Sequence, residues 1–302
     1  MSAPVTTALT EVAGVQFLEC EPMARHTSLG VGGPADLLAI PRDEAAVAGL
    51  LQVCRDTGTP YLVIGNGTNI VCRDGGFRGL VIKLGEPLGA IRREGTRLIA
   101  QGGSGLGRVG LLAAEAGLSG LAWSAGIPGT VGGAVWMNAG ANGGDVGQTV
   151  RRVVALSPDG ERVTLQHDEL DFAYRHSALQ GMPLIVVQVE FELVEGDPAD
   201  IRREMYETVE RRLERQPLKE RSAGSTFKRP PGDFAGRLID CSGCKGLAVG
   251  GAMISPKHAG FIVNRGDATA SDVLQLLQQV RQRVHDEHGI WLEPEVCVIG
   301  ED

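Results

Sequence analysis

Glycine accounts for 43 of the 302 residues, about twice its usual share of ~7%. These glycines follow no collagen-like period, and many stand in apolar segments rather than in the serine-rich, charged stretches typical of flexible linkers. Glycine is needed where the backbone adopts a left-handed turn or where another group must approach it closely. We therefore expect an ordered fold with several tight loops that face a ligand.

The overall composition is that of a globular chain. Hydrophobic residues make up 43% of the sequence and charged residues 22%, which suits two or three domains with sizeable cores. The net charge of -8 argues against a nucleic-acid partner or an anionic membrane surface. Residues 1–15 contain no basic residue, and no apolar window approaches the ~18 residues of a membrane span. We therefore expect a cytoplasmic protein with no signal peptide, membrane insertion or nucleic-acid partner.

Six cysteines are scattered along the chain, as is typical of free thiols in a reducing compartment. Only Cys241 and Cys244 form a close pair, which would suit either a redox-active dithiol or half of a zinc site. No second cysteine pair accompanies them, and His285 and His288 stand beside acidic residues typical of a solvated helix surface. We therefore expect no metal centre.

Hydrophobic periodicity predicts helices and strands over most of the chain. The first clear unit is a strand at 36–40, a helix at 43–56 and a strand at 61–64, and a crossover of that length favours parallel pairing of the two strands. Further strands are predicted at 80–84, 97–101, 152–156, 162–165, 184–194 and 291–300, and further helices at 106–116, 198–215 and 271–288. The glycine-rich segment 123–147 shows neither period, so we expect an ordered loop there.

The segment Gly105–Gly110 matches the dinucleotide-binding pattern G-x-G-x-x-G between a predicted strand and a predicted helix. In that fold an acidic residue follows about 20 positions later, at the end of the next strand. Residues 121–141 contain neither Asp nor Glu. The pattern therefore favours a glycine-rich helix start, near another ligand or near none, over a nicotinamide-binding site.

A basic run lies between residues 210 and 229, where seven basic residues stand against three acidic ones and give a local charge of +4. Such a run is usually a solvated helix face. Here it leads into Gly224 and Ser225, where Arg and Lys side chains could instead clamp a diphosphate. Both interpretations stay open at this stage.

Eight short motifs follow one another along the chain. The first four are Thr27–Gly33, which has one extra residue of spacing, Gly65–Asn69, Gly126–Ala134 and Met137–Gly140. The other four are Tyr174–Ser177, Ala223–Lys228, His258–Asn264 and Leu292–Val296. In this order the motifs resemble those of the UDP-N-acetylenolpyruvoylglucosamine reductase family, and the resemblance extends from about residue 26 to residue 300.

The resemblance implies an α+β protein with a vanillyl-alcohol-oxidase (PCMH)-type FAD-binding fold of two α+β subdomains, followed by a C-terminal α+β substrate-binding domain. We expect the first FAD-binding subdomain at 1–84, where the C-terminal strand could return to it, the second at 85–196 and the substrate-binding domain at 197–302. The turn at Gly196–Pro198 supports the last boundary. The short connection after Arg175 resembles the short, type II-like subfamily.

Non-covalently bound FAD is also implied by the resemblance. Glycines without side chains would let backbone N–H groups approach the FAD diphosphate. The positions that match the family's FAD-binding motifs are Gly65, Asn66, Gly67, Thr68, Asn69, Ile127, Pro128, Gly129, Thr130, Gly132, Gly133, Asn138 and Ala139.

The implied reaction is reduction of UDP-N-acetylglucosamine enolpyruvate to UDP-N-acetylmuramate, with hydride passing from NADPH to flavin N5 and then to the enolpyruvyl methylene carbon. Arg175 matches the family's arginine that stabilises the carboxylate and enolate, Ser225 its proton donor, and Glu295 its third catalytic residue. Each has a plain structural alternative. Arg175 could pair with Glu169 or Asp171. Ser225 could cap a helix, and Glu295 could lie on a strand surface.

Substrate contacts are implied for Tyr174, Arg215, Lys228 and Arg229. Many relatives have Asn where Arg229 stands, so this position departs from the family's pattern. Two other functions stay open: a different flavin oxidase or dehydrogenase, which would give no reason for the motifs around Ser225 and Glu295, and a non-catalytic sugar-nucleotide sensor that has kept the fold.

Overall fold

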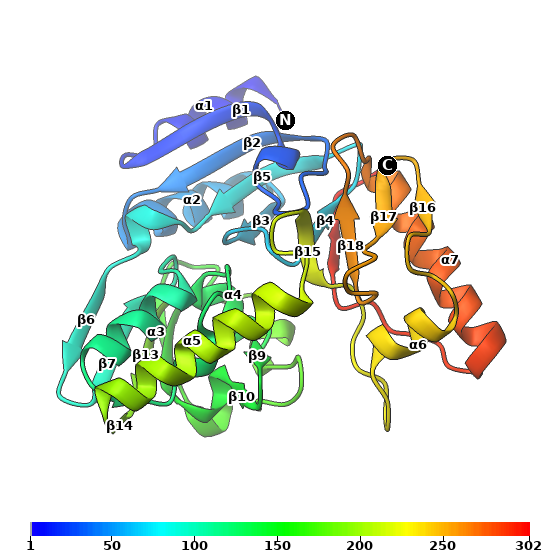
Figure 1. Ribbon diagram of the computed structural model, residues 1–302. Coiled ribbons are helices and arrows are strands. Elements are labelled where there is room, and N and C mark those ends of the chain that lie inside the picture. Colours follow the sequence, from blue (N-terminus) through cyan, green and yellow to red (C-terminus); the bar gives the residue numbers. More distant parts are fainter. Residues whose placement is uncertain (1) are drawn as a thin grey trace. The chain divides into compact units, whose positions relative to one another are not determined.

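The computed structural model describes residues 2–302, which form a mixture of α-helices and β-sheets (Figure 1). The described chain divides into two compact units. The first comprises residues up to Glu19, Leu37–Asn66 and Gly79–Glu210, and the second comprises Cys20–Asp36, Gly67–Arg78 and Arg211–Asp302. The three-part division expected from the sequence remains a prediction.

A four-stranded sheet has the order β1-β2-β5-β3, with β1 at Val15–Pro22, β2 at Pro34–Pro41, β5 at Phe77–Lys83 and β3 at Tyr61–Ile64. The expected pairing of the strands that flank the first helix is therefore wrong, because β5 lies between β2 and β3 and pairs in parallel with β3. Leu80, Val81 and Ile82 of β5 are completely buried. A continuously apolar strand of this kind suits a central position with both faces covered.

Helix α2 (Glu44–Thr57) belongs to the first unit and is preceded by the short helix α1 (Ala3–Thr10). The Asp43 carboxylate accepts a hydrogen bond from Ala46 N at 2.9 Å and so caps α2. Gly58, with φ +64°, ends α2 in a left-handed turn. The apolar face of α2 is buried, as the helical spacing predicts. Its buried residues are Ala46, Val47, Leu50, Leu51 and Cys54.

The second sheet of this unit is antiparallel and five-stranded. Its order is β12 (Arg162–Gln166), β11 (Val150–Leu156), β13 (Ile185–Glu192), β7 (Arg97–Gln101) and β6 (Ile91–Glu94). One face packs against helices α3 (Leu106–Glu115) and α4 (Val131–Trp136) in a shared apolar core. The other face contributes Val154 and Val187 to the core beneath α2.

The glycine-rich segment 123–147 contains regular structure, so the expected loop is only partly correct. Thr130 caps α4 by accepting a hydrogen bond from Gly133 N at 3.4 Å, and Val131, Ala134 and Val135 of this helix are buried. Two very short strands follow, β9 (Gly140–Ala141) and β10 (Gly144–Asp145). A helix of six residues is too short to show an amphipathic period in the sequence. Tertiary packing therefore determines that this segment is helical.

Helix packing explains one glycine of the G-x-G-x-x-G segment. A Cβ on Gly110 would stand 2.4 Å from Ser124 Oγ, and Gly105 forms an isolated bridge with Thr130. Leu106 N donates to Gly129 O at 3.0 Å. The close approach of Ser124 accounts for Gly110 without a dinucleotide, whereas a Cβ on Gly105 would meet only Arg108 Cβ at 3.9 Å.

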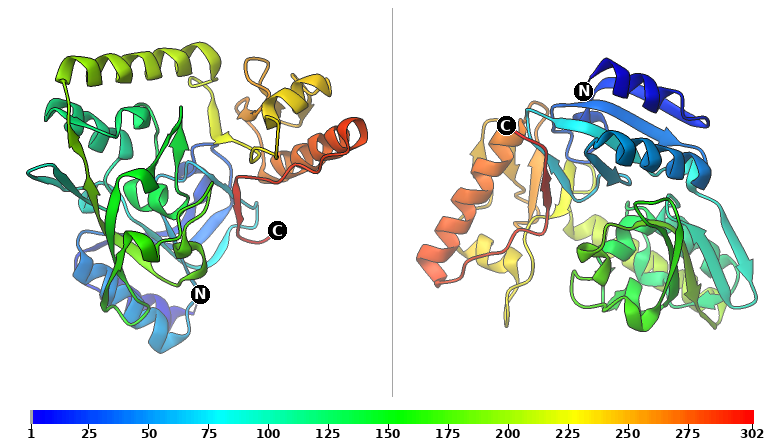
Figure 2. Two further views of the ribbon diagram at one scale, coloured as in Figure 1. Left: turned by 90° about the horizontal axis from the view of Figure 1, so that it is seen from below. Right: turned by 180° about the vertical axis from the view of Figure 1, so that it is seen from behind.

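The second unit contains an antiparallel sheet of order β15 (Arg221–Ser225), β18 (Phe261–Asn264), β17 (Ala252–Ile254) and β16 (Ala248–Val249). Helix α7 (Ala270–His288) runs along this sheet (Figure 2). Its buried side chains share an apolar core with those of α6 (Ala235–Cys241). Thr269 and Asp272 form a capping box at the start of α7, and Gly289 ends it at φ +70°.

The chain closes with β19 (Cys297–Ile299), which pairs in parallel with β4 (Ile70–Cys72). The strand expected over 291–300 is therefore much shorter than predicted. Pro294 carries no N–H for a ladder and makes only an isolated bridge to Phe227. Helix α5 (Pro198–Arg215) matches its expected bounds, and the boundary between the two units falls within it.

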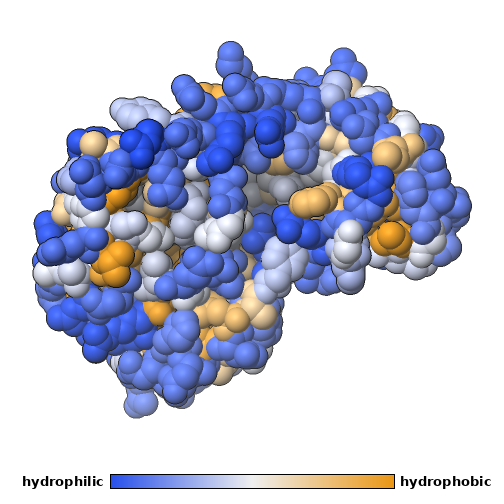
Figure 3. Space-filling view, turned by 60° about the horizontal axis from the view of Figure 1, so that its bottom comes forward, coloured by the Kyte–Doolittle hydropathy of each residue, from blue (hydrophilic) through white to orange (hydrophobic). Residues whose placement is uncertain are grey.

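On the face seen in Figure 3 hydrophilic residues predominate, and hydrophobic ones occur singly or in small groups. None of the helices within residues 2–302 combines the length and the apolar character needed to cross a membrane. Among the same residues no group of three or more His, Cys, Asp or Glu side chains could hold a metal ion. All six cysteines, Cys241 and Cys244 included, are free thiols.

Candidate active site

In the first unit the structure brings two of the glycine-rich motifs together. Asn66 follows β3, and its Nδ2 donates to Pro128 O at 2.7 Å. A Cβ on Gly65 would stand only 2.1 Å from Thr130 Oγ1, so no other residue type fits there without displacing Thr130. Residues more than sixty positions apart thus form one loop pair, as a common ligand site requires.

Several backbone groups of the second motif already have partners within the protein. Gly132 N donates to Gly102 O at 2.8 Å, and Ile127 N donates to Ser124 O at 3.0 Å. Ala139 N likewise donates to Ala134 O at 2.8 Å. These three N–H groups therefore fix the shape of the loop, and side chains or other backbone groups must supply its contacts to a ligand.

Gly67, Thr68 and Asn69 belong to the second unit. Gly67 has φ +62°, and a Cβ there would stand 2.0 Å from His26 O. The Asn69 side chain donates to Glu295 O at 3.0 Å, and Asn69 O accepts from Cys297 N at 2.9 Å. The end of this turn therefore holds the segment that carries Glu295.

Arg175 lies at the tip of a tight turn in the first unit. Ala173 and His176 exchange backbone hydrogen bonds of 3.1 and 3.0 Å across the turn, and Arg175 itself has φ +55°. Its Nη2 donates to Gly140 O at 3.3 Å, and its guanidinium carbon lies 5.1 Å from the centre of the Tyr174 ring. A left-handed backbone is strained for a long side chain and recurs at functional positions.

The acidic residues considered as partners of Arg175 have other contacts. Glu169 Oε2 accepts a hydrogen bond from Gln166 N at 2.8 Å, and Asp171 lies 3.5 Å from His176. The Tyr174 ring beside Arg175 is 55% exposed. Tyr174 therefore stands at the surface of the turn, whereas Arg175 is partly buried.

Ser225 and Glu295 are brought together in the second unit. Ser225 ends β15 opposite Phe261, after an irregularity in the ladder at which Gly224 has φ +74°. Its neighbour Thr226 accepts a hydrogen bond from Glu295 N through the backbone carbonyl at 2.8 Å. The two motifs are thus held in adjacent positions by backbone pairing, although seventy residues separate them. Because Ser225 lies on a strand, the interpretation of Ser225 as a helix cap is wrong.

The side chains expected to contact substrate occupy different environments. Lys228 Nζ lies 2.6 Å from Glu293 Oε1, and the Arg229 guanidinium carbon lies 4.5 Å from the centre of the Phe234 ring. Arg215 is exposed in the last turn of α5. Burial raises the pKa of the nearby Cys297 thiol. The charge of Lys228 acts to lower this pKa, and the charge of Glu295 acts to raise it. Lys228 and Glu295 therefore act on the same small region.

Ser28 was assigned no role from the sequence, although it lies within the Thr27–Gly33 motif. Its N donates to Gly67 O at 3.1 Å, and its Oγ donates to Ser222 O at 2.7 Å. Ser28 therefore links the glycine turn to the strand that ends in Ser225. The signal available in the sequence was a serine within a glycine-rich motif.

Comparisons with known proteins show the family to which the chain belongs. Residues 216–299 match the profile of the UDP-N-acetylenolpyruvoylglucosamine reductase C-terminal domain, and residues 35–166 match that of an FAD binding domain. The UDP-N-acetylenolpyruvoylglucosamine reductase of Heliobacterium modesticaldum is 49% identical over 287 residues, which cover 95% of this chain and 91% of the relative. The chain belongs to the UDP-N-acetylenolpyruvoylglucosamine reductase family.

Other members of the family are similarly close. The reductase of Clostridium botulinum is 46% identical over 282 residues, covering 93% of this chain and 92% of the relative. The crystal structure of the UDP-N-acetylenolpyruvylglucosamine reductase from Thermus caldophilus superimposes with a TM-score of 0.82 at 39% identity, covering 95% of this chain and 99% of that one. The chain is therefore a flavin-dependent oxidoreductase of this family, and FAD is its cofactor.

A more distant structural likeness concerns the fold alone. The glucooligosaccharide oxidase of Acremonium strictum has a TM-score of 0.51 at 16% identity, covering 97% of this chain and 59% of that one. Together with the FAD-binding profile, it confirms the α+β FAD-binding fold class expected from the sequence.

The residues present fit such a cofactor. A Cβ on Gly65 would meet Thr130 Oγ1 at 2.1 Å and one on Gly67 would meet His26 O at 2.0 Å, so only glycine lets this turn pack as it does. Asn66 and Thr68 add an amide and a hydroxyl beside them. This is the donor set that a diphosphate requires.

Proposed function

We propose that the chain reduces UDP-N-acetylglucosamine enolpyruvate to UDP-N-acetylmuramate with electrons from NADPH. The backbone hydrogen bond from Glu295 N to the carbonyl of Thr226, the residue after Ser225, carries this proposal, because a merely flavin-binding fold gives no reason for it. This reaction would supply a peptidoglycan precursor, and we place it in the cytoplasm, where NADPH and sugar nucleotides are available. UDP-N-acetylglucosamine enolpyruvate and NADPH are the small-molecule partners, and no nucleic acid is involved.

The FAD-binding loops are proposed to comprise the positions expected from the sequence, Gly65 and Gly67 among them, except the Asn138 side chain, whose amide is bonded to Ala173 O and Gly147 N. Bound FAD supplies the chemistry that accepts a hydride from one molecule and gives it to another. The protein's own contribution is to hold this group, to exclude water and to orient the substrate. The Asn66 amide and the Thr68 hydroxyl supply polar contacts beside the two glycines.

Arg175 is proposed to bind the substrate carboxylate. When hydride reaches the methylene carbon, negative charge develops on the neighbouring carbon and its carboxylate. A guanidinium offers two parallel N–H donors to a carboxylate and stabilises the charge as it forms. The left-handed turn presents Arg175 for this purpose. Tyr174, Arg215, Lys228 and Arg229 are proposed as further substrate contacts.

Ser225 is proposed to donate the proton, and Glu295 to bind the enolate. A serine hydroxyl is a weak acid in water, so it requires a strongly basic carbon and a site closed to solvent. Glu295 would donate a hydrogen bond in its protonated form, which requires a raised pKa. The paired backbones of Thr226 and Glu295 hold the two groups on one small region.

The experiment that tests this function follows flavin and NADPH separately. The purified protein should show a flavin absorption spectrum and should oxidise NADPH only when UDP-N-acetylglucosamine enolpyruvate is present. Ser225→Ala should leave flavin reduction by NADPH unchanged and slow substrate turnover by ~10²–10⁴-fold. Normal turnover in this variant would refute the assignment.

The same assay separates the other two functions. A different flavin oxidase would consume NADPH or another donor without the enolpyruvyl sugar nucleotide, and a sensor would bind that nucleotide without oxidising NADPH.

If NADPH and substrate alternate at one site, initial-rate lines should run parallel and excess substrate should inhibit. Intersecting lines would contradict a single alternating site.

A further inference from the structure

The Asn138 side chain is almost entirely enclosed within the first unit. It is 4% exposed, and its backbone is left-handed with φ +41°. Its Nδ2 donates to Ala173 O at 2.9 Å, and its Oδ1 accepts from Gly147 N at 2.9 Å. Both ends of the amide are thus engaged with the backbone.

Ala173 is the residue at which the Arg175 turn begins. Its carbonyl oxygen accepts from His176 N across the turn as well as from Asn138. The amide therefore fastens the base of a two-residue tip that carries Tyr174 and a left-handed Arg175. A strained tip keeps one conformation only when surrounding contacts determine it.

Two further side chains support the other leg of the turn. Ser177 is completely buried, and its Oγ donates to Trp136 O at 2.8 Å. Gln180 Nε2 lies 3.0 Å from Trp136 O and 3.1 Å from Arg175 O. Asn138 differs from both because its Oδ1 also accepts from Gly147 N, in the short 3-10 helix Val146–Gln148 that follows β10. It alone of the three connects that segment with the base of the turn.

We propose that Asn138 is a positioning residue for Arg175, which holds the guanidinium in place for the enolpyruvyl carboxylate rather than binding FAD through its own side chain. This inference rests on the proposed function, in which Arg175 acts on the substrate. It replaces the cofactor contact expected from the sequence, because the amide oxygen and the amide nitrogen are each committed to a backbone group of the protein.

The test compares Asn138→Ala with Arg175→Ala in the complete, FAD-loaded enzyme. Rapid mixing gives two rates, reduction of the flavin by NADPH and reoxidation of the reduced flavin by UDP-N-acetylglucosamine enolpyruvate. In Asn138→Ala we expect flavin reoxidation to slow about 10- to 100-fold, because the Arg175 guanidinium would be misplaced relative to the substrate carboxylate. Flavin reduction and the affinity for FAD should stay within about twofold of wild type.

The decisive measurement is the double variant. Because Asn138 acts through Arg175, Asn138→Ala should slow reoxidation less than about twofold further when Arg175 is already Ala. A full, independent loss in the double variant would overturn the inference. So would a large fall in FAD affinity with normal reoxidation, which would mean that Asn138 contacts the cofactor. Normal turnover in Arg175→Ala alone would instead refute the proposed function.

Asn142→Ala is the matched control, since Asn142 is an exposed asparagine of the same loop with φ +54°. It should leave the rates of flavin reduction and reoxidation unchanged.

Asn138→Gly and Asn138→Asp replace Asn138→Ala in the test if that variant folds poorly. Glycine keeps the left-handed backbone without the amide, and aspartate keeps the acceptor for Gly147 N but places a carboxylate against Ala173 O. Either variant should show the same selective loss of reoxidation, and unchanged reoxidation in both would overturn the inference.

Discussion

Single residues in this protein are placed by backbone geometry as much as by side-chain contacts. Arg175 is left-handed at a turn tip, and Ser225 follows the left-handed Gly224 at a ladder irregularity. In each case an unusual backbone lies at or beside a residue with a proposed catalytic role and helps to fix the direction in which its side chain leaves the chain. Substitutions that keep charge but change shape should therefore be informative.

Arg175→Lys keeps the positive charge but removes the planar pair of donors. We expect turnover of the enolpyruvyl substrate to fall about 10- to 100-fold, because an ammonium cannot bind a carboxylate through two parallel hydrogen bonds. Flavin reduction by NADPH should not change, and stopped-flow absorbance measures the two steps separately. Arg202→Lys, on the exposed side of α5, is the control. Equal activity of Arg175→Lys and wild type would argue against recognition by the guanidinium fork.

At the scale of elements, short turns hold segments that are distant in the sequence. Gly67 lies against His26 O, and Ser28 connects Gly67 with the strand of Ser225. Asn69 holds the Glu295 segment. The Gly65–Asn69 motif therefore organises its surroundings, in addition to the FAD contact proposed for it.

Gly67→Ala should release FAD. The added Cβ would stand 2.0 Å from His26 O at a residue whose φ is +62°, so the turn must move. Flavin content after gel filtration and titration calorimetry with FAD measure the loss. Gly58→Ala is the control, because Gly58 has φ +64° with nothing within 4 Å of the new Cβ. It carries only the left-handed penalty of ~1–2 kcal/mol. If both variants keep FAD equally well, the close approach at Gly67 is unimportant.

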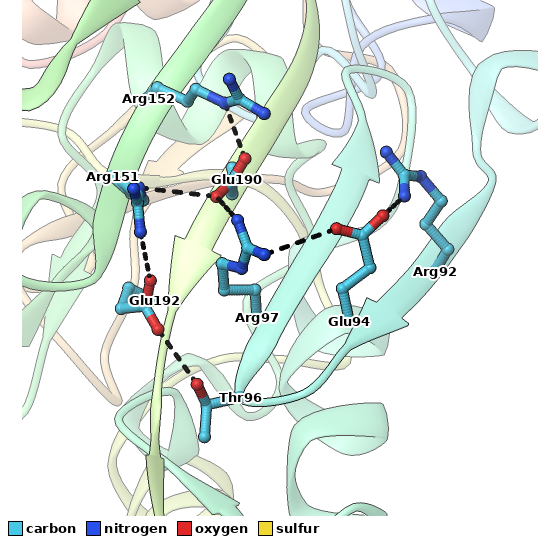
Figure 4. Close-up of polar contacts among 8 residues, drawn as sticks. All are labelled: Arg92, Glu94, Thr96, Arg97, Arg151, Arg152, Glu190 and Glu192. Atoms are coloured by element: carbon cyan, nitrogen blue, oxygen red, sulfur yellow. Dashed lines mark hydrogen bonds and ion pairs between the residues drawn. The ribbon is translucent and has the colours of Figure 1, made fainter.

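At the scale of the whole molecule, ion pairs stabilise a sheet face that the apolar core leaves uncovered. Glu190 of β13 is 1% exposed and points toward three arginines (Figure 4). Arg97 Nη1 lies 3.0 Å and Arg152 Nε 2.6 Å from its two oxygens, and Arg151 Nε lies 3.6 Å away. Burial alone would raise the pKa of Glu190, but hydrogen bonds from Arg97 and Arg152 outweigh it and lower the pKa.

Glu190→Gln should therefore destabilise the first unit in a pH-dependent way. A lowered pKa means that the ionised carboxylate stabilises the folded state above the ordinary pKa of about 4.3, and that this contribution is lost as pH falls through the lower, folded-state value. We expect a loss of about 1–3 kcal/mol near pH 7 that shrinks toward zero below pH ~4. Hydrogen exchange of the β13 amides at several pH values measures this loss of stability locally.

Glu192→Gln is the matched control for Glu190→Gln, because Glu192 lies on the same strand and pairs with Arg151 at 3.0 Å but is 44% exposed. An exposed pair contributes little, so this variant should change hydrogen exchange only slightly. A pH-independent effect of Glu190→Gln would show that side-chain packing rather than charge supplies the stability.

The sequence by itself determined the elements whose signals are local and the motifs that point to FAD and to the enolpyruvyl substrate. Helices α2 and α7 lie within a residue of their expected bounds, because caps and apolar spacing act within a few residues. Tertiary structure decided what local patterns cannot express. It inserted β5 between β2 and β3, made α4 helical and bonded Glu295 to Thr226, the residue after Ser225. It also tied Asn138 to the turn of Arg175, since a hydrogen bond between distant segments depends on where packing places them.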